Sequence, residues 1–136
     1  MHSPEHAAVG AVVSAVGVAV LAFTEAFSLA ALLALWAYGV ALSVFVDLDH
    51  FLIARIQTGD WSHLRTSLRD LRGAFLDQEG AFRGLAMERR RHLSHHLVVG
   101  LLVGALALVS VPVAAFTAVV LYAHVLCDLL RDNEIA

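Results

Sequence analysis

The chain has 136 residues, of which 60% are apolar and only 15% are charged, and its mean hydropathy is +0.77. Soluble domains are typically ~45–50% apolar and ~25% charged, so this composition excludes an ordinary soluble protein and indicates a membrane protein. Nine arginines, no lysine and twelve acidic residues give a formal net charge of −3, which argues against nucleic-acid binding through overall charge. The single Cys127 excludes a disulfide framework.

Four apolar runs follow one another along the chain, and each predicts a membrane span. The predicted spans are residues 6–24, 27–50, 93–110 and 113–131. A signal peptide carries basic residues before its apolar stretch, and the first run has none there. We therefore expect this run to be retained as a membrane span. A span takes ~20 residues, and the short connections within each pair predict two antiparallel helical hairpins. We therefore expect an all-α, four-span transmembrane bundle that forms a single membrane domain over residues 1–136.

Two glycines in the third run, Gly100 and Gly104, lie four residues apart on one helix face. This small-residue spacing permits close contact between membrane helices. The pair is therefore a candidate packing site for a neighbouring helix.

A polar loop between the hairpins, residues 56–92, carries seven of the nine arginines. The positive-inside rule places this loop in the cytoplasm of the cell, and with it both chain termini. After Asp60, a candidate N-cap, apolar residues recur at three- and four-residue steps, which predicts an amphipathic helix. This helix either lies on the inner leaflet or packs against the bundle. Its apolar positions are Trp61, Leu64, Leu68, Leu71 and Phe75.

Candidate metal ligands lie at one end of each predicted span. Antiparallel alternation brings the starts of the odd spans and the ends of the even spans to the same membrane face. Ionisable residues within spans cost ~2.5–3.5 kcal/mol each, so such a cluster indicates a shared site. Imidazole and carboxylate groups together form a ligand set for zinc, manganese or iron, and zinc or manganese is expected here, as one or two ions. The candidate ligands are His6, Asp47, Asp49, His50, His92, His95, His124 and Asp128.

Four short motifs contain these residues in a fixed order along the chain. They are Glu5-His6, Asp47-Leu48-Asp49-His50, Arg90-Arg91-His92-Leu93-Ser94-His95-His96 and His124-Val125-Leu126-Cys127-Asp128. Their order and placement resemble the family of membrane-bound metal-dependent hydrolases across nearly the whole chain. The resemblance implies a metal-dependent hydrolase. It also aligns Arg90 with a family histidine, which makes His92 the candidate replacement ligand, and it implies that Arg91 holds an anionic group of the substrate.

We expect metal-assisted hydrolysis at the cytoplasmic membrane interface, acting on a phosphoester in a lipid or in another anionic substrate. A divalent ion lowers the pKa of a bound water toward ~7 and polarises a phosphoryl oxygen. One carboxylate, Asp49 or Asp128, is the candidate general base, and Arg91 is the candidate partner of the substrate phosphate. The arginines of the loop also fit an anchoring role under the positive-inside rule.

Three other functional classes remain open: a metal carrier or sensor, a b-type haem protein and a metal-free scaffold. The first and third spans are apolar beyond their inner ends, which argues against a path for ions. Carboxylates among the histidines fit a hard-metal site better than haem. The expected partners are the lipid bilayer and the anionic substrate, without nucleic acid. A homo-oligomer is also open, because four short helices enclose little space.

Overall fold

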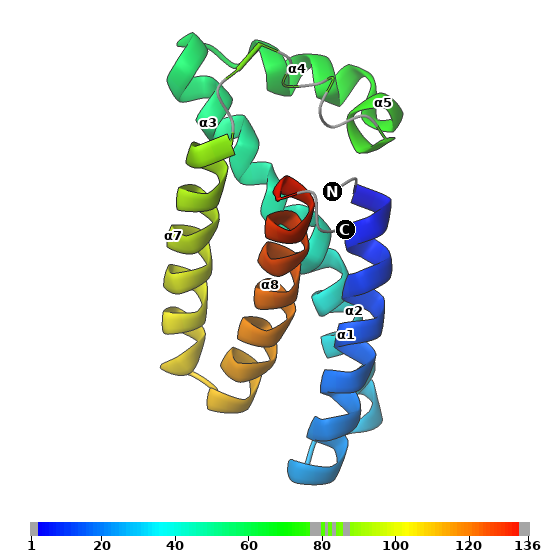
Figure 1. Cartoon of the computed structure of the whole chain (residues 1–136). Coiled ribbons are helices and arrows are strands. Elements are labelled where there is room, and N and C mark those ends of the chain that lie inside the picture. Colours follow the sequence, from blue (N-terminus) through cyan, green and yellow to red (C-terminus); the bar gives the residue numbers. More distant parts are fainter. Residues whose placement is uncertain (1–2, 77–79, 81, 83, 86–87, 134–136) are drawn as a thin grey trace.

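The computed structural model describes residues 3–76, 80, 82, 84–85 and 88–133. Within these ranges every regular element is a helix, which confirms the predicted all-α class. In chain order the elements are α1 (Ser3–Thr24), α2 (Leu29–Phe45), the short 3-10 helix η1 (Val46–Leu48), α3 (Asp49–Thr58), α4 (Ser62–Arg69), α5 (Leu71–Leu76), α7 (Glu88–Ala107) and α8 (Val111–Asp132) (Figure 1).

Three of the described helices are long and apolar enough to cross a membrane. They are α1, the continuous helix Leu29–Thr58 formed by α2, η1 and α3, and α8. Large apolar side chains on their outer surfaces are exposed, among them Val16, Leu33 and Val119. Such surfaces fit a bilayer, because a soluble protein would expose few contiguous apolar side chains. The chain therefore has the helices of a membrane-associated protein.

Helix α7 differs from the three membrane-length helices. Its first half is rich in arginine and histidine, and its continuous apolar part covers only residues 97–107. At 1.5 Å per residue this part is ~16 Å long, about half of the ~30 Å hydrocarbon layer. The four-span arrangement therefore stays a prediction.

Helix α8 lies between α7 and the pair formed by α1 and α2 (Figure 1). Helices α1 and α2 pack side by side, α8 contacts both, and α7 packs against α8 and α3. Ser28 and Ser110 cap the starts of α2 and α8, because their hydroxyl groups accept hydrogen bonds from the backbone N–H of the third residue of each helix, Ala31 and Val113. The directions of the helices bring the starts of α1, α3 and α7 and the end of α8 to the same end of the bundle (Figure 1).

Helices α1 and α2 approach each other closely where glycine faces serine. A Cβ atom on Gly10 would lie only 2.0 Å from Ser43 Oγ, and one on Gly39 would lie 2.2 Å from Ser14 Oγ. Any larger residue would therefore push the two helices apart. The Ser43 hydroxyl also donates a hydrogen bond to the backbone carbonyl of His6, 3.1 Å away, which joins the helices beside a candidate ligand.

Gly100 and Gly104, which the sequence predicts as a packing site for a neighbouring helix, do not make a close helix contact within the described structure. A Cβ on Gly100 or on Gly104 would meet no atom within 4 Å in the described structure. The close helix contact is made instead by glycines of the first hairpin. At the far end of the bundle, α1 and α8 pack through Leu21, Phe116 and Val120, the apolar core.

The predicted amphipathic helix is divided into α4 and α5 at Asp70. Asp70 Oδ1 accepts the backbone N–H of Gly73 at 2.8 Å and so begins a new helix. The N-cap residue of α4 is Trp61 and not the predicted Asp60, which lies one position earlier in the chain. The Asp60 carboxylate nevertheless accepts a hydrogen bond from the first residue of the helix, Ser62. Hydrogen bonds from the side chain and the backbone of Ser62 hold the pKa of Asp60 below its usual 3.8, and the backbone bond is 2.8 Å long.

The apolar stripe of this segment is partly exposed. Trp61, Leu68 and Leu71 are exposed, whereas Leu64 is half-buried. The Phe75 side chain lies outside the described part of the structure. Helix α5 contacts α1, and α4 contacts α3, so the segment lies over the end of the bundle that carries the candidate ligands.

Candidate metal centre

All eight predicted ligands lie at one end of the bundle, and seven of them form a single group there. His6 comes from α1, Asp47 from η1, Asp49 and His50 from the start of α3, His95 from α7, and His124 and Asp128 from α8. The short 3-10 helix interrupts a long apolar helix at this point, and a 3-10 stretch within a helix often marks a functional hinge or local strain. The structure therefore brings together residues from four separate parts of the sequence.

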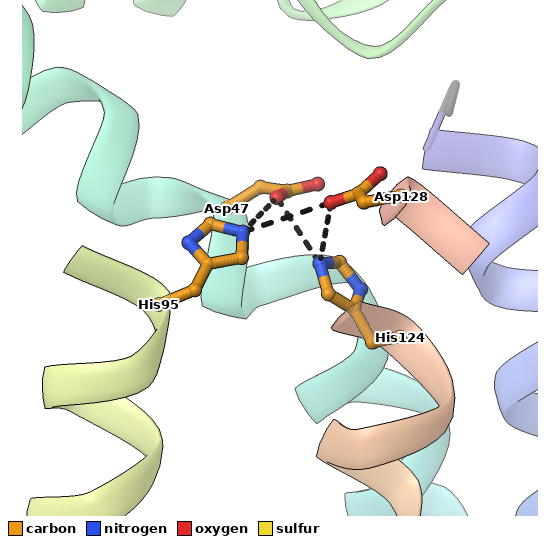
Figure 2. Close-up of side chains that lie close together, drawn as sticks. All are labelled: Asp47, His95, His124 and Asp128. Atoms are coloured by element: carbon orange, nitrogen blue, oxygen red, sulfur yellow. Dashed lines mark hydrogen bonds and ion pairs between the residues drawn. The ribbon is translucent and has the colours of Figure 1, made fainter. Parts of the chain in front are cut away.

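Four ligand atoms face one another at the centre of this group (Figure 2). His95 Nε2 lies 3.1 Å from Asp47 Oδ1 and 3.9 Å from Asp128 Oδ2. His124 Nε2 lies 3.4 Å from Asp47 Oδ1 and 3.5 Å from Asp128 Oδ2. In a tetrahedral zinc site with bonds of 2.0–2.1 Å, neighbouring ligand atoms are ~3.3 Å apart. The four atoms thus have the spacing of ligands around a single ion.

The hydrogen bonding of His124 fixes which of its nitrogens faces the centre without a proton. His124 Nδ1 lies 2.8 Å from the backbone carbonyl oxygen of Ser43. A carbonyl only accepts hydrogen bonds, so Nδ1 carries the hydrogen, and a neutral ring then has a bare Nε2. Nε2 is buried, has no hydrogen-bond partner among the described residues, and faces Asp47 and Asp128. A metal ion would satisfy the nitrogen and both carboxylates together.

Asp49 lies behind His95, on the side away from the four-ligand group. His95 Nδ1 lies 2.7 Å from Asp49 Oδ2, and Ser94 Oγ lies 2.6 Å from the same oxygen. A carboxylate that accepts the second N–H of a ligating histidine fixes the orientation of the ring and strengthens the opposite nitrogen as a ligand. Asp49 therefore fits the role of a residue that positions His95.

His6 lies against the second oxygen of each carboxylate in the four-ligand group. Its Nε2 is 3.2 Å from Asp128 Oδ1 and 4.0 Å from Asp47 Oδ2. The ring also stacks on His124, with 3.9 Å between the ring centroids. Asp47 and Asp128 therefore each direct one oxygen toward His95 and His124 and the other toward His6.

His50 flanks the centre on the opposite side. Its ring stacks on that of His95, with 5.3 Å between centroids and an angle of 18°. His50 Nε2 lies 3.8 Å from Asp47 Oδ1 and 3.9 Å from Asp49 Oδ1. Asp49, His50 and His95 form a second group whose geometry allows a metal ion, and it shares His95 with the first.

The carboxylates of the centre are deeply buried. The side chains of Asp47, Asp49 and Asp128 expose 5%, 6% and 2% of their surface. Removing a carboxylate from water is unfavourable by several kcal/mol unless nearby charges and hydrogen bonds compensate it. Three carboxylates at one point require positive charge, which a divalent cation supplies. Protonated histidines are the alternative source of this charge.

Two predicted site residues lie apart from this group. His92 Nε2 is 3.0 Å from Asp132 Oδ2 near the end of α8, and the guanidinium of Arg91 pairs with the same carboxylate. The structure thus places His92 beside Asp132 and not among the grouped ligand atoms. Arg91 is largely buried, with 18% of its side chain exposed. The side chain of Arg89, in the same arginine cluster, lies outside the described part of the structure.

Three further residues shape the site and were not identified from the sequence: Ser43, Ser94 and Asp132. Ser43 acts through its backbone carbonyl, which any residue type possesses, so no sequence signal exists for it. Ser94 directly precedes His95, and a hydroxyl beside a ligand histidine is a weak signal for such a role. Asp132 lies one turn beyond Asp128 on α8, and that spacing was the available clue.

Comparison of the chain with family models, curated proteins and solved structures finds no match. The resemblance to membrane-bound metal-dependent hydrolases rests on the four motifs.

Proposed function

We propose that this chain is a membrane-embedded metal-dependent hydrolase that cleaves a phosphoester or a related anionic ester. The observation that carries the proposal is the orientation of His124, whose Nδ1 donates to the Ser43 carbonyl and whose Nε2 faces two buried carboxylates. This is the arrangement of a metal ligand held by a hydrogen bond on its far side. Zinc or manganese suits the mixture of imidazole and carboxylate ligands. Membership of the membrane-bound metal-dependent hydrolases is part of the same proposal.

The proposed topology places the metal centre at the cytoplasmic face of the membrane. The arginines of the α4–α5 segment lie at the same end of the bundle as the centre. Positive charge concentrates on the cytoplasmic side of membrane proteins, so this end faces the cytoplasm. Helix α7 then forms the fourth span, with its histidine-rich start at the interface and its apolar part in the bilayer.

The chemistry follows from the positions of the side chains. A divalent ion among Asp47, His95, His124 and Asp128 would lower the pKa of a bound water toward ~7 and polarise the ester. Asp49 lies outside this four-residue group, and its Oδ2 atom is taken up by His95 and Ser94. Its other oxygen, Oδ1, has no hydrogen-bond partner among the described residues and is the candidate general base. Arg91 lies near the centre and can pair with an anionic group once Asp132 releases it.

The second oxygens of Asp47 and Asp128 provide a position for a second ion. His6 Nε2 lies beside both of these oxygens. Carboxylates that bridge two ions ~3.5–4 Å apart are typical of two-metal hydrolases. We therefore propose that His6 completes the ligand set of a two-metal centre.

A metal-binding protein without hydrolase activity is the second candidate function. The observation in its favour is the depth of burial, because His95, His124 and Asp128 are each at most 2% exposed. An enclosed site of this kind suits a structural or sensing ion, whereas catalytic sites keep one position open. The haem alternative is less favoured, because His6 and His124 stack face to face at 3.9 Å and leave no gap between them for a porphyrin.

The test is metal analysis and hydrolysis with two adjacent histidine variants. The protein is purified without chelator in lipid nanodiscs, and bound metals are quantified by mass spectrometry for wild type, His95→Ala and His96→Ala. His96 is the matched control, because it is exposed and its Nδ1 donates to the backbone carbonyl of His92 in its own helix. Turnover of bis(4-nitrophenyl) phosphate and 4-nitrophenyl phosphate is measured with zinc and with manganese.

We expect stoichiometric metal and phosphoester turnover in wild type and in His96→Ala, and the loss of both in His95→Ala. Wild-type protein that retains no metal would refute the metal centre. Metal that is retained without turnover of either substrate would favour the second candidate. A Soret absorption band would instead identify a haem protein.

A further inference from the structure

An apolar cavity of about 170 Å³ lies directly beside the metal centre, between η1, α3 and the α4–α5 segment. Asp47, a member of the four-ligand group, forms part of its wall. The facing wall comes from Leu64, Ser67 and Leu71 of α4 and α5. We call this space the α4 cavity. The amphipathic segment therefore borders a space that reaches the candidate metal site.

The α4 cavity continues outward into exposed apolar surface. Leu48, Leu68 and Leu71 line the cavity, yet 55%, 62% and 66% of their surface is exposed. Amphipathic helices with such side chains lie in the membrane interface with their apolar face toward the acyl chains. Three helices of the chain are of membrane length, so this rim would lie close to lipid. A hydrocarbon chain can therefore enter the cavity from the side without crossing water.

The cavity is apolar at one end and ionisable at the other. The Asp47 side chain is 5% exposed, and its Oδ2 atom has no hydrogen-bond partner among the described residues. Hydrocarbon cannot satisfy a buried carboxylate, whereas a metal ion with a bound anionic head group can. The two ends thus match the two ends of an amphiphile. Phe82 connects them, since its ring lies 5.0 Å from that of Phe51 and 5.6 Å from that of His50.

We propose that the α4 cavity binds the hydrocarbon chain of an amphiphilic phosphate ester whose head group lies at the metal centre. This inference rests on the proposed function and names its substrate class. The volume is close to that of the ~150 Å³ apolar cavity known to take a benzene ring, so the cavity holds only the first carbons of a chain. The rest of the chain extends into the bilayer. Binding should therefore strengthen about fourfold per methylene over the first carbons and then level off.

The test uses octyl phosphate that carries a photoreactive diazirine near the middle of its chain. Protein in nanodiscs is labelled with this probe or with the matching diazirine octanol, and the labelled peptides are identified by mass spectrometry. Ser67→Phe fills the cavity, whereas Thr66→Phe places the same ring on the adjacent, exposed position of α4. Ala74→Leu is a second, smaller filling variant in α5. Thermal melting and metal content show whether each variant is folded.

We expect the phosphate probe to label peptides of α4 and α3 in wild type and in Thr66→Phe, with at least tenfold less label in Ser67→Phe and in Ala74→Leu. Unlabelled octyl phosphate should compete, and inorganic phosphate should compete far less. Unchanged labelling in both filling variants would overturn the inference. Equal labelling by the octanol probe would also overturn it, because the cavity would then be a general lipid site. Labelling that persists in wild type without bound metal would refute the proposed function and leave the cavity assignment intact.

Discussion

His95 Nδ1 lies 2.7 Å from Asp49 Oδ2, which places a buried carboxylate directly behind a candidate metal ligand. The opposite nitrogen, Nε2, faces Asp47 at 3.1 Å. Asp49 is therefore placed to orient the ring, and Asp47 is placed to share a bound ion with it.

Asp49→Asn should weaken metal binding without abolishing it. Loss of a carboxylate behind a ligating histidine typically lowers metal affinity by ~10–100-fold. Affinity is measured by competition with a chelator of known zinc affinity, alongside Asp47→Asn, which should lose the ion. If Asp49→Asn removes the metal as completely as Asp47→Asn, then Asp49 is itself a direct ligand.

His6→Ala should remove one of two bound ions. The Nε2 atom of His6 lies beside the outer oxygens of Asp47 and Asp128, so the ion held by the four-ligand group should remain. The measurement is the metal-to-protein ratio after equilibration with zinc or manganese, which we expect to fall from two to one. A wild-type ratio of one, unchanged in His6→Ala, would contradict a two-metal centre.

Arg91→Gln should lower kcat/KM for phosphoesters by ~10–100-fold, because a hydrogen bond to a charged group is worth ~1.5–3 kcal/mol. Metal content should not change, since Arg91 pairs with Asp132 and lies outside the ligand group. Arg90→Gln, on the exposed neighbouring position, is the control. A loss of bound metal in Arg91→Gln would show instead that the arginine maintains the structure of the centre.

Gly10→Ala should destabilise the protein and weaken metal binding together. The added Cβ would lie 2.0 Å from Ser43 Oγ, and Ser43 holds both His6 and His124 through its hydroxyl and its carbonyl. Overpacking of this kind costs ~1–3 kcal/mol. Gly104→Ala is the matched control, because its Cβ meets no described atom within 4 Å. Equal melting temperatures and zinc affinities for the two variants would contradict the close helix contact.

Asp60→Ala should loosen the start of α4, which forms a wall of the α4 cavity. The pKa of Asp60 is held below its usual 3.8 by Ser62, so its stabilising effect is complete above that pH. The effect is lost as the pH falls through the lower pKa of the folded protein, because the protonated carboxyl is a weaker acceptor. Hydrogen exchange of the α4 amides should be faster in the variant at pH 6 and should converge with wild type at strongly acidic pH. A difference that persists there would point to another cause.

The helical class and the gathering of ligands at one end of the bundle were predictable from sequence. Hydropathy depends on the residues of each run alone, and antiparallel alternation then decides which run ends meet. Helix α1, Ser3–Thr24, overlaps the first predicted span, residues 6–24, whereas the second predicted span ends at residue 50 and the continuous helix runs on to Thr58. Helix α7 is the exception, because arginine and histidine shorten its apolar part below the length of a membrane span.

Other features could not be predicted from the spacing of residues along the chain, because they depend on three-dimensional contacts. The partner of His92 is Asp132 of another helix, and the break at Asp70 reflects competition between a side chain and the helix backbone. Likewise, Gly10 and Gly39 rather than Gly100 and Gly104 make the close helix contact, since only the rotation of each helix determines which face meets a neighbour.

By itself, the sequence determined that this chain is apolar, helical and supplied with imidazole and carboxylate groups at the ends of its helices. The tertiary structure decided which of these groups lie close enough together to share an ion and which lie outside that group, because ligand bonds of ~2 Å require atoms placed to within a fraction of that length. Such placement comes from helix packing and from the carbonyl of Ser43, both of which arise only when distant segments meet.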